Sequence, residues 1–286
     1  MDRFAEKQAW IEARRQELIL QYPALLEKII SAWQQPGSDP RAWLLYSANY
    51  LFHTGGVRWA LDPFLLPSRL GVVDYEALPD FSPLSFALLT HEHRDHLDLG
   101  FINFLSALPM RWVIPQALQA RVLGSSRLDA NKVITPRPMK WLELEGIRIL
   151  PFEAQHFALE NGRLRGVPAM GYLVEQDGRR WLFPGDTRDY DLRLQPRLEA
   201  VDAAFVHLWL GRREALEQNP SQLAAFCRFC AGLPARRIFL THLEELGRQA
   251  DDYWDLDHAG RVMELLKLVC PEKSVQAFRM GDEIEL

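Results

Sequence analysis

The stretch that most constrains this chain lies at residues 88–100, which read LLTHEHRDHLDLG. Four potential metal ligands fall within six consecutive positions of it: His91, His93, Asp95 and His96. Histidine is otherwise scarce, with eight in the whole chain. The short apolar run at 86–90 is typical of a buried strand, and residues 97–108 have helical spacing. We therefore expect the cluster at the carboxyl end of a strand, where open α/β folds commonly bind ligands.

The types and spacing of these side chains favour metal binding over packing. His91 and His93 alternate by one residue, so both can face one metal ion in an extended turn, while Asp95 and His96 can face a second. Zinc prefers imidazole nitrogen and carboxylate oxygen in a site left open to water. Two such ions about 3.5–4 Å apart hold a bridging hydroxide that can attack a carbonyl carbon or a phosphorus. The alternative, unconnected polar groups, suits a lone histidine better than this cluster.

The motif His-Glu-His-Arg-Asp-His at 91–96 resembles the His-x-His-x-Asp-His motif of the metallo-β-lactamase superfamily. The remaining ligands of that family have counterparts downstream, each after a strand-like run. These counterparts are His156, Asp186 in a Gly-Asp-Thr turn, and His242. The resemblance extends from about Ser47 to residue 286.

The resemblance implies two metal sites that share one carboxylate. The first ion would be bound by His91, His93 and His156. The second would be bound by Asp95, His96 and His242. Asp186 would bridge the two ions, and Asp95 would also move a proton to the leaving group. We expect two divalent ions, zinc first, with manganese or iron as alternatives.

Asp62 is expected to support the metal loop. It ends a predicted strand at 57–61 and is followed by Pro63. Within the superfamily, the chain is most similar to the branch with ascorbate-phosphate lactonase and N-acylphosphatidylethanolamine phospholipase D-like enzymes. There, such an aspartate orients metal-bound histidines. Many members of that branch carry Gly-His near the first strand, where this chain has Tyr-Ser-Ala-Asn at 46–49. This departure concerns the substrate and leaves the metal ligands intact.

The alternation of strand-like and helical runs predicts an α/β or α+β protein. A hairpin is expected at 43–61 around Gly55-Gly56, and another at 170–183 around Asp177-Gly178. The resemblance makes the expected fold a four-layer αβ/βα sandwich, with an extra helical segment at the N-terminus and the metals at one edge.

Residues 1–33 carry apolar side chains at helical intervals, and Pro23 is expected to divide the helix in two. The loop at 34–40 gives a predicted boundary between an N-terminal helical extension (1–40) and a metallo-β-lactamase-like domain (41–286). Such an extension packs on its own domain or on a second copy, so a homo-oligomer is one expectation. No signal peptide and no membrane-spanning run is recognised, which predicts a cytoplasmic protein.

Composition limits the classes of partner. The net charge is −5, from 33 basic and 38 acidic side chains. The chain as a whole therefore has no electrostatic attraction for nucleic acid. The three cysteines do not suggest a disulfide framework. Cys227 and Cys230 could form a redox or zinc pair, but helical spacing around them favours two buried thiols one turn apart.

The predicted function is that of a metal-dependent hydrolase of a phosphoester, lactone or other small ester. A nuclease acting on nucleic acid, and a non-catalytic scaffold on the same fold, are the alternatives. Arg94, Arg188 and Tyr190 lie next to the metal ligands in sequence and are candidates for binding a small-molecule substrate. Guanidinium groups suit phosphate and carboxylate oxygens. His207, at a strand end, is a candidate for an extra ligand or acid, but a half-buried structural histidine is the preferred interpretation.

Overall fold

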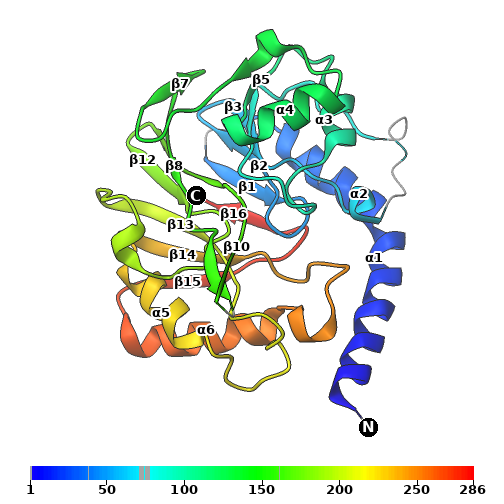
Figure 1. The fold of residues 1–286 in the computed structure, drawn as a ribbon. Helices are drawn as coiled ribbons and strands as arrows, with labels where there is room; N and C mark the ends of the chain where they lie inside the picture. The colour runs from blue at the N-terminus through cyan, green and yellow to red at the C-terminus, as the bar shows by residue number, and fades with distance from the viewer. Residues whose placement is uncertain (1, 38, 71–73, 75–77, 161) are drawn as a thin grey trace.

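Two mixed sheets of seven strands each face one another, and helices cover their outer surfaces (Figure 1). This computed structural model describes residues 2–37, 39–70, 74, 78–160 and 162–286. The arrangement confirms the predicted four-layer sandwich with an additional N-terminal helix.

The first sheet is antiparallel on one side and parallel on the other. Its strands, in spatial order, are β16 (Glu283–Glu285), β1 (Arg41–Leu44), β2 (Tyr50–Thr54), β3 (Val57–Leu61), β4 (Phe86–Leu88), β5 (Arg111–Val113) and β6 (Val133–Ile134). The pairs from β16 to β3 are antiparallel, and those from β3 to β6 are parallel. The predicted hairpin is present as β2–β3, but the run before its turn forms two strands instead of one.

The second sheet repeats this plan. Its strands, in spatial order, are β15 (Ser274–Ala277), β14 (Ala235–Thr241), β13 (Val201–His207), β12 (Arg179–Phe183), β11 (Met170–Gln176), β8 (Ile147–Glu153) and β7 (Leu142–Leu144). The pairs from β7 to β12 are antiparallel, and those from β12 to β15 are parallel.

The core between the two sheets is rich in aromatic side chains. Phe52 stacks on Trp59 with ring centroids 3.8 Å apart, and Phe183 and Phe205 from the second sheet pack against Phe52 edge to face. These residues alternate inward along their strands, so burial of large apolar faces holds the sheets together.

Helices pack on the outside of both sheets. They are α1 (Arg3–Gln34), α2 (Leu66–Leu70), α3 (Leu99–Leu105), α4 (Gln116–Ser125), α5 (Leu223–Gly232) and α6 (Leu256–Val269), with 3-10 turns at Ala130–Lys132, Leu192–Leu194 and Ala250–Asp252. Cys227 and Cys230 are buried free thiols on α5, in agreement with the packing interpretation. Among the described residues, no helix is long and apolar enough to cross a bilayer.

The expectation that Pro23 divides the N-terminal helix was wrong. Helix α1 is continuous through Pro23. The proline is exposed, while buried apolar residues lie on both sides of it, including Leu18 and Leu26. Packing of that face against the first sheet therefore outweighs the backbone hydrogen bond that the proline cannot make.

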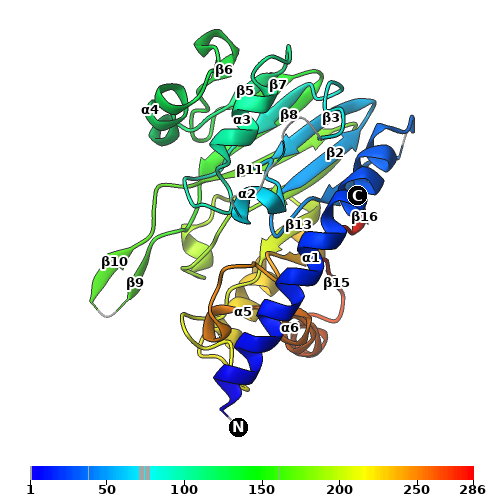
Figure 2. The same cartoon turned by 90° about the vertical axis from the view of Figure 1, so that its right-hand side faces the viewer.

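A short hairpin that the sequence did not predict projects from the body (Figure 2). It consists of β9 (Ala158–Glu160) and β10 (Arg163–Arg165), which pair with each other in a separate two-stranded sheet. Their strands are three residues long and β10 is exposed, so they carry no alternating pattern for a sequence reading to detect.

Candidate metal centre

The predicted ligands follow strands of both sheets and meet at one edge of the sandwich. His91, His93, Asp95 and His96 follow β4, while His156 follows β8, Asp186 follows β12 and His242 follows β14. Several of these turns need left-handed backbone. Asp62, Gly185 and His242 have φ values of 44°, 74° and 66°. Such values in non-glycine residues cost energy and tend to occur at functional sites.

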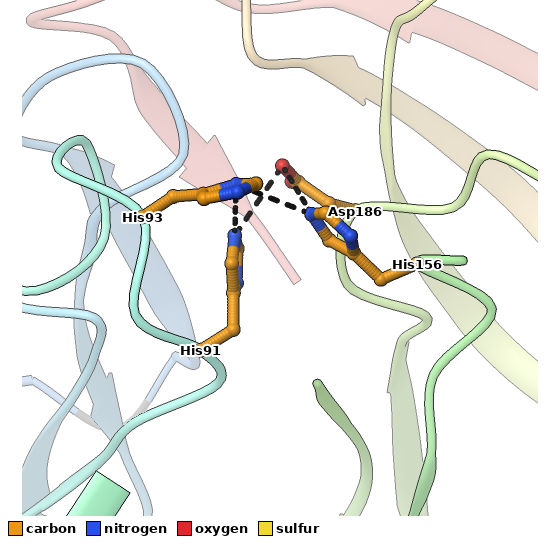
Figure 3. Close-up of side chains that lie close together, drawn as sticks. All are labelled: His91, His93, His156 and Asp186. Atoms are coloured by element: carbon orange, nitrogen blue, oxygen red, sulfur yellow. Dashed lines mark hydrogen bonds and ion pairs between the residues drawn. The ribbon is translucent and has the colours of Figure 1, made fainter. Parts of the chain in front are cut away.

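One cluster joins His91, His93, His156 and Asp186 (Figure 3). His93 Nδ1 lies 3.1 Å from His91 Nε2 and 3.2 Å from His156 Nε2. Asp186 Oδ2 lies 3.6 Å and 3.9 Å from the same two Nε2 atoms. One potential ligand atom from each residue lies within 4.8 Å of all the others, so the group could hold one metal ion.

A second cluster joins Asp95, His96, His242 and, again, Asp186. His242 Nε2 lies 3.0 Å from Asp95 Oδ2, and His96 Nε2 lies 3.3 Å from Asp186 Oδ1. The two oxygens of Asp186 therefore face different clusters, Oδ2 the first and Oδ1 the second. This is the arrangement expected of a carboxylate shared by two ions.

The orientation of the imidazoles tests whether these residues fit metal ions. In the first cluster, three ring nitrogens face one another, although each neutral imidazole has one donor and one acceptor nitrogen. His96 Nε2 is buried and makes no hydrogen bond within the described part of the chain, despite lying near Asp186. Ring nitrogens that converge without suitable hydrogen-bond partners can instead bind a cation. These side chains therefore fit divalent metal ions as ligands.

The outward nitrogens of two rings are fixed by neighbours. His96 Nδ1 lies 2.7 Å from Asp62 Oδ2, and His91 Nδ1 lies 2.9 Å from Thr90 Oγ1. These contacts leave Nε2 of both rings directed inward. His156 differs, because its Nδ1 accepts a long, 3.3 Å hydrogen bond from the Val167 backbone N–H. A neutral imidazole carries one proton, so a metal ion bound at His156 Nε2 would leave that proton on Nδ1. Nδ1 could then no longer accept the hydrogen bond from Val167.

Burial and neighbouring charges set the protonation of the clusters. Burial lowers the pKa of His91 well below its usual range and lowers that of His156 to about 4, so both rings are neutral, as metal ligands must be. Burial alone would raise the pKa of Asp186, but His96 and His242 hold it well below the usual range. The shared carboxylate is therefore ionised.

The structure places Asp62 and an unpredicted residue, Asn49, behind the ligands. Asp62 accepts hydrogen bonds from the Thr90 backbone N–H and hydroxyl and faces His96. The buried Asn49 amide donates to the backbone carbonyls of Asp62 and Asp95, at 2.9 and 2.8 Å. Asn49 belongs to the stretch at 46–49 in which the sequence departs from the family pattern. That departure is the sequence feature that could have pointed to Asn49.

His207 also lies at the centre, although sequence reasoning preferred a structural role for it over that of an extra ligand or acid. Its Nδ1 lies 2.6 Å from Asp186 Oδ1, and its side chain is buried. It therefore orients the shared carboxylate. Its position at the end of β13, between the strands that deliver Asp186 and His242, was the signal for this role.

The three candidate substrate-binding residues lie in two different places. Arg94 and Arg188 line a cavity of about 440 Å³ that also reaches His93 and Asp95. Tyr190 lies elsewhere: its ring packs on Phe226 and Phe229 of α5, and its hydroxyl donates to the Trp209 carbonyl. Tyr190 thus contributes to packing in the second half of the molecule.

Comparisons with known proteins identify the family of this chain. Residues 64–243 match the family model described as the β-lactamase superfamily domain. An N-acyl-phosphatidylethanolamine-hydrolyzing phospholipase D of Caenorhabditis elegans is 28% identical over 179 residues, which cover 54% of this chain and 48% of that protein. The match therefore spans about half the length of the curated relative.

Solved structures share the fold at low identity. Igni18, a metallo hydrolase from Ignicoccus hospitalis, has a TM-score of 0.63 at 15% identity, covering 87% of this chain and 99% of that one. CmlA, a diiron β-hydroxylase from Streptomyces venezuelae, has a TM-score of 0.62 at 15% identity, covering 88% of this chain and 55% of that one. With the family match extending over most of its length, this chain belongs to the β-lactamase superfamily.

Proposed function

We propose that this protein is a metal-dependent hydrolase with a dinuclear centre, acting on a phosphoester, lactone or other small ester. The observation that carries the proposal is the pair of four-residue clusters sharing Asp186. Three imidazoles face one side of this carboxylate and two imidazoles with Asp95 face the other, which is a donor set for two divalent ions.

Ions held there would lower the pKa of water and polarise the oxygens of the scissile group. The chain supplies the remaining functions. Asp186 keeps the two sites together, and His207 and Asp62 hold ligand side chains in position. Asp95 lines both its cluster and the adjoining cavity, so its carboxylate would take up the proton released by the attacking water and pass it to a leaving group located there.

Zinc is the proposed metal, because imidazole and carboxylate in a buried, open-sided site suit it. Iron is the alternative, since a diiron protein shares the fold. Elemental analysis of protein purified without added metal distinguishes them. Zinc near two equivalents per chain supports the hydrolase, whereas iron would favour redox chemistry.

A phosphoester is the preferred substrate class. The cavity beside the clusters is lined by several arginines, and the related worm protein is named for phospholipase activity. A nuclease would also act on a phosphoester, but the net charge of −5 gives long nucleic acids no general attraction. Salt-dependent RNA binding would revive that alternative.

The proposal is tested by assaying the purified chain against phosphodiesters, lactones and thioesters with zinc and manganese side by side. Asp186→Ala is expected to lower bound metal below one ion per chain and to abolish turnover while circular dichroism stays unchanged. His53→Gln is the matched control, because this buried histidine belongs to neither cluster. Full turnover by a metal-free Asp186→Ala protein would end the proposal.

A further inference from the structure

A series of buried polar side chains leads from the shared carboxylate into the core between the two sheets. His207 Nδ1 lies 2.6 Å from Asp186 Oδ1, and His207 Nε2 lies 3.4 Å from the Tyr50 hydroxyl. The Tyr50 hydroxyl in turn lies 2.6 Å from Thr241 Oγ1. Tyr50 and Thr241 are fully buried, and His207 is only 4% exposed. Polar groups this deeply buried depend on one another for hydrogen bonds, because water does not reach them.

This series joins the two sheets at the edge where the metal clusters lie. Tyr50 begins β2 of the first sheet, whereas His207 and Thr241 end β13 and β14 of the second sheet. His207 and Thr241 are paired across these parallel strands. The Tyr50 ring packs edge to face on Phe205, with ring centroids 5.3 Å apart. The aromatic core therefore holds the Tyr50 hydroxyl in a fixed position next to His207.

One order of donors and acceptors satisfies every member of the series. A carboxylate can only accept, so His207 donates to Asp186 through Nδ1. A neutral imidazole that donates through Nδ1 accepts through Nε2, and the Tyr50 hydroxyl is the donor within reach. Burial raises the pKa of Tyr50, so the hydroxyl keeps the hydrogen that Nε2 needs. Thr241 then donates to Tyr50, which is its side-chain partner within the described part of the chain.

We propose that Tyr50 is a positioning residue for the metal centre and acts on Asp186 through His207. The binding of metal by Asp186 rests on the proposed function. A single hydrogen bond would let the imidazole pivot about Nδ1, whereas a second one on the opposite nitrogen fixes the plane of the ring. The ring in turn holds Asp186 Oδ1, which lies 3.3 Å from His96 Nε2 in the second cluster. Because Tyr50 is fully buried, it affects the shared carboxylate without touching a substrate.

Long-range proton–nitrogen NMR of the isotope-labelled, chelated full-length chain tests the contact between Tyr50 and His207. The His207 signals are identified by their absence from the His207→Ala spectrum. Tyr50→Phe removes only the hydroxyl and keeps the packed ring, so it should move the His207 Nε2 resonance toward that of a nitrogen without a hydrogen-bond donor. Tyr22→Phe is the matched control, because this buried hydroxyl donates to the Leu45 carbonyl outside the clusters. An unmoved Nε2 resonance in folded Tyr50→Phe would overturn the proposal.

Titration with zinc against a competing chelator tests the effect on the metal centre. Tyr50→Phe should weaken zinc binding about tenfold, the lower end of the range for residues behind metal ligands, because it acts through an intervening ring. In a His207→Ala background the same substitution should have no further effect. An equal loss in both backgrounds, or the same affinity as Tyr22→Phe, would overturn the proposal. A wild-type chain that binds no metal, but whose His207 resonance moves in Tyr50→Phe, would overturn the proposed function alone.

Discussion

At the scale of single residues, Asp62 shows how the metal loop is held. It is fully buried, its backbone is left-handed, and its carboxylate receives both the Thr90 backbone N–H and the Thr90 hydroxyl. The same carboxylate faces His96 Nδ1 at 2.7 Å. One side chain thus fixes the start of the loop and the direction of a ligand ring.

Asp62→Ala is therefore expected to lower metal affinity about 10–100-fold, because His96 loses the partner that orients Nε2. Competition with a chromogenic chelator measures the affinity. Asp202→Ala is a suitable control, since Asp202 accepts a backbone hydrogen bond from Arg180 outside the clusters. Equal affinities for the two variants would show that Asp62 has no role in orientation.

The residues that sequence reasoning could and could not predict differ in a physical way. The clustered ligands occupy one short motif, and the others follow apolar strands, so type and context mark them. Asn49 and Arg248 belong to no such motif and follow no predicted strand as ligands do, and for Asn49 the only signal was a departure from the family pattern. Asn49 acts through backbone carbonyls that only the folded chain brings near, and Arg248, which lines the cavity beside the clusters, is placed by Glu245 after a turn without a motif.

At the scale of elements, helix α1 contains an exposed proline, Pro23, at an interior position where proline is unfavourable. Pro23→Ala restores a backbone donor and removes a steric conflict without touching the core. The free energy of unfolding is expected to rise by about 2 kcal/mol, the gain being reduced by the added freedom of the unfolded chain. Urea denaturation measures it. Lys28→Ala, also exposed on α1, should change it by less than about 0.5 kcal/mol.

Helix α6 begins at a charged cap that also contacts α1. The Asp255 carboxylate accepts the backbone N–H groups of Asp257 and His258 and pairs with Lys7. Asp255→Ala should lower the free energy of unfolding by about 1–2 kcal/mol.

This difference should depend on pH. Burial alone would raise the pKa of Asp255, but His258 and Lys7 hold it below the ordinary value. Its contribution is therefore complete above the unfolded-state pKa of about 4 and is lost as pH falls below it. Denaturation at pH 7 and pH 3 tests the sign: a gap between wild type and Asp255→Ala that widened in acid would contradict it.

Helices and strands were predictable from the sequence where the periodic pattern of apolar residues extends over many positions. Strands such as β13 and the helix α6 have buried faces, and their patterns are visible in the sequence. Helix α1 was divided wrongly because proline is normally disruptive, whereas tertiary packing decided here.

At the scale of the whole molecule, α1 connects the two halves (Figure 2). Near its start, Lys7 pairs with Asp255 and Gln8 accepts the Ala250 backbone N–H. Near its end, the buried Trp33 donates to the Phe52 carbonyl at 3.0 Å. The predicted boundary at residue 40 remains a prediction, but the helix shares a core with the first sheet.

Trp33→Ala should accordingly lower the free energy of unfolding by about 3–5 kcal/mol, because it empties a fully buried site. Trp10→Ala, on the same helix but 46% exposed, is the control and should cost much less. Thermal denaturation compares the two. Equal melting temperatures would mean that α1 is an appendage to an independently stable domain.

The pairing of β16 with β1 joins segments 240 positions apart, as the contact between Trp43 and Glu283 shows. During synthesis, β1 must leave the ribosome long before its partner exists. The nascent chain therefore carries an open strand edge for most of translation, when it is most exposed to aggregation. This edge is sealed only after residues 283–285 have emerged and paired with β1.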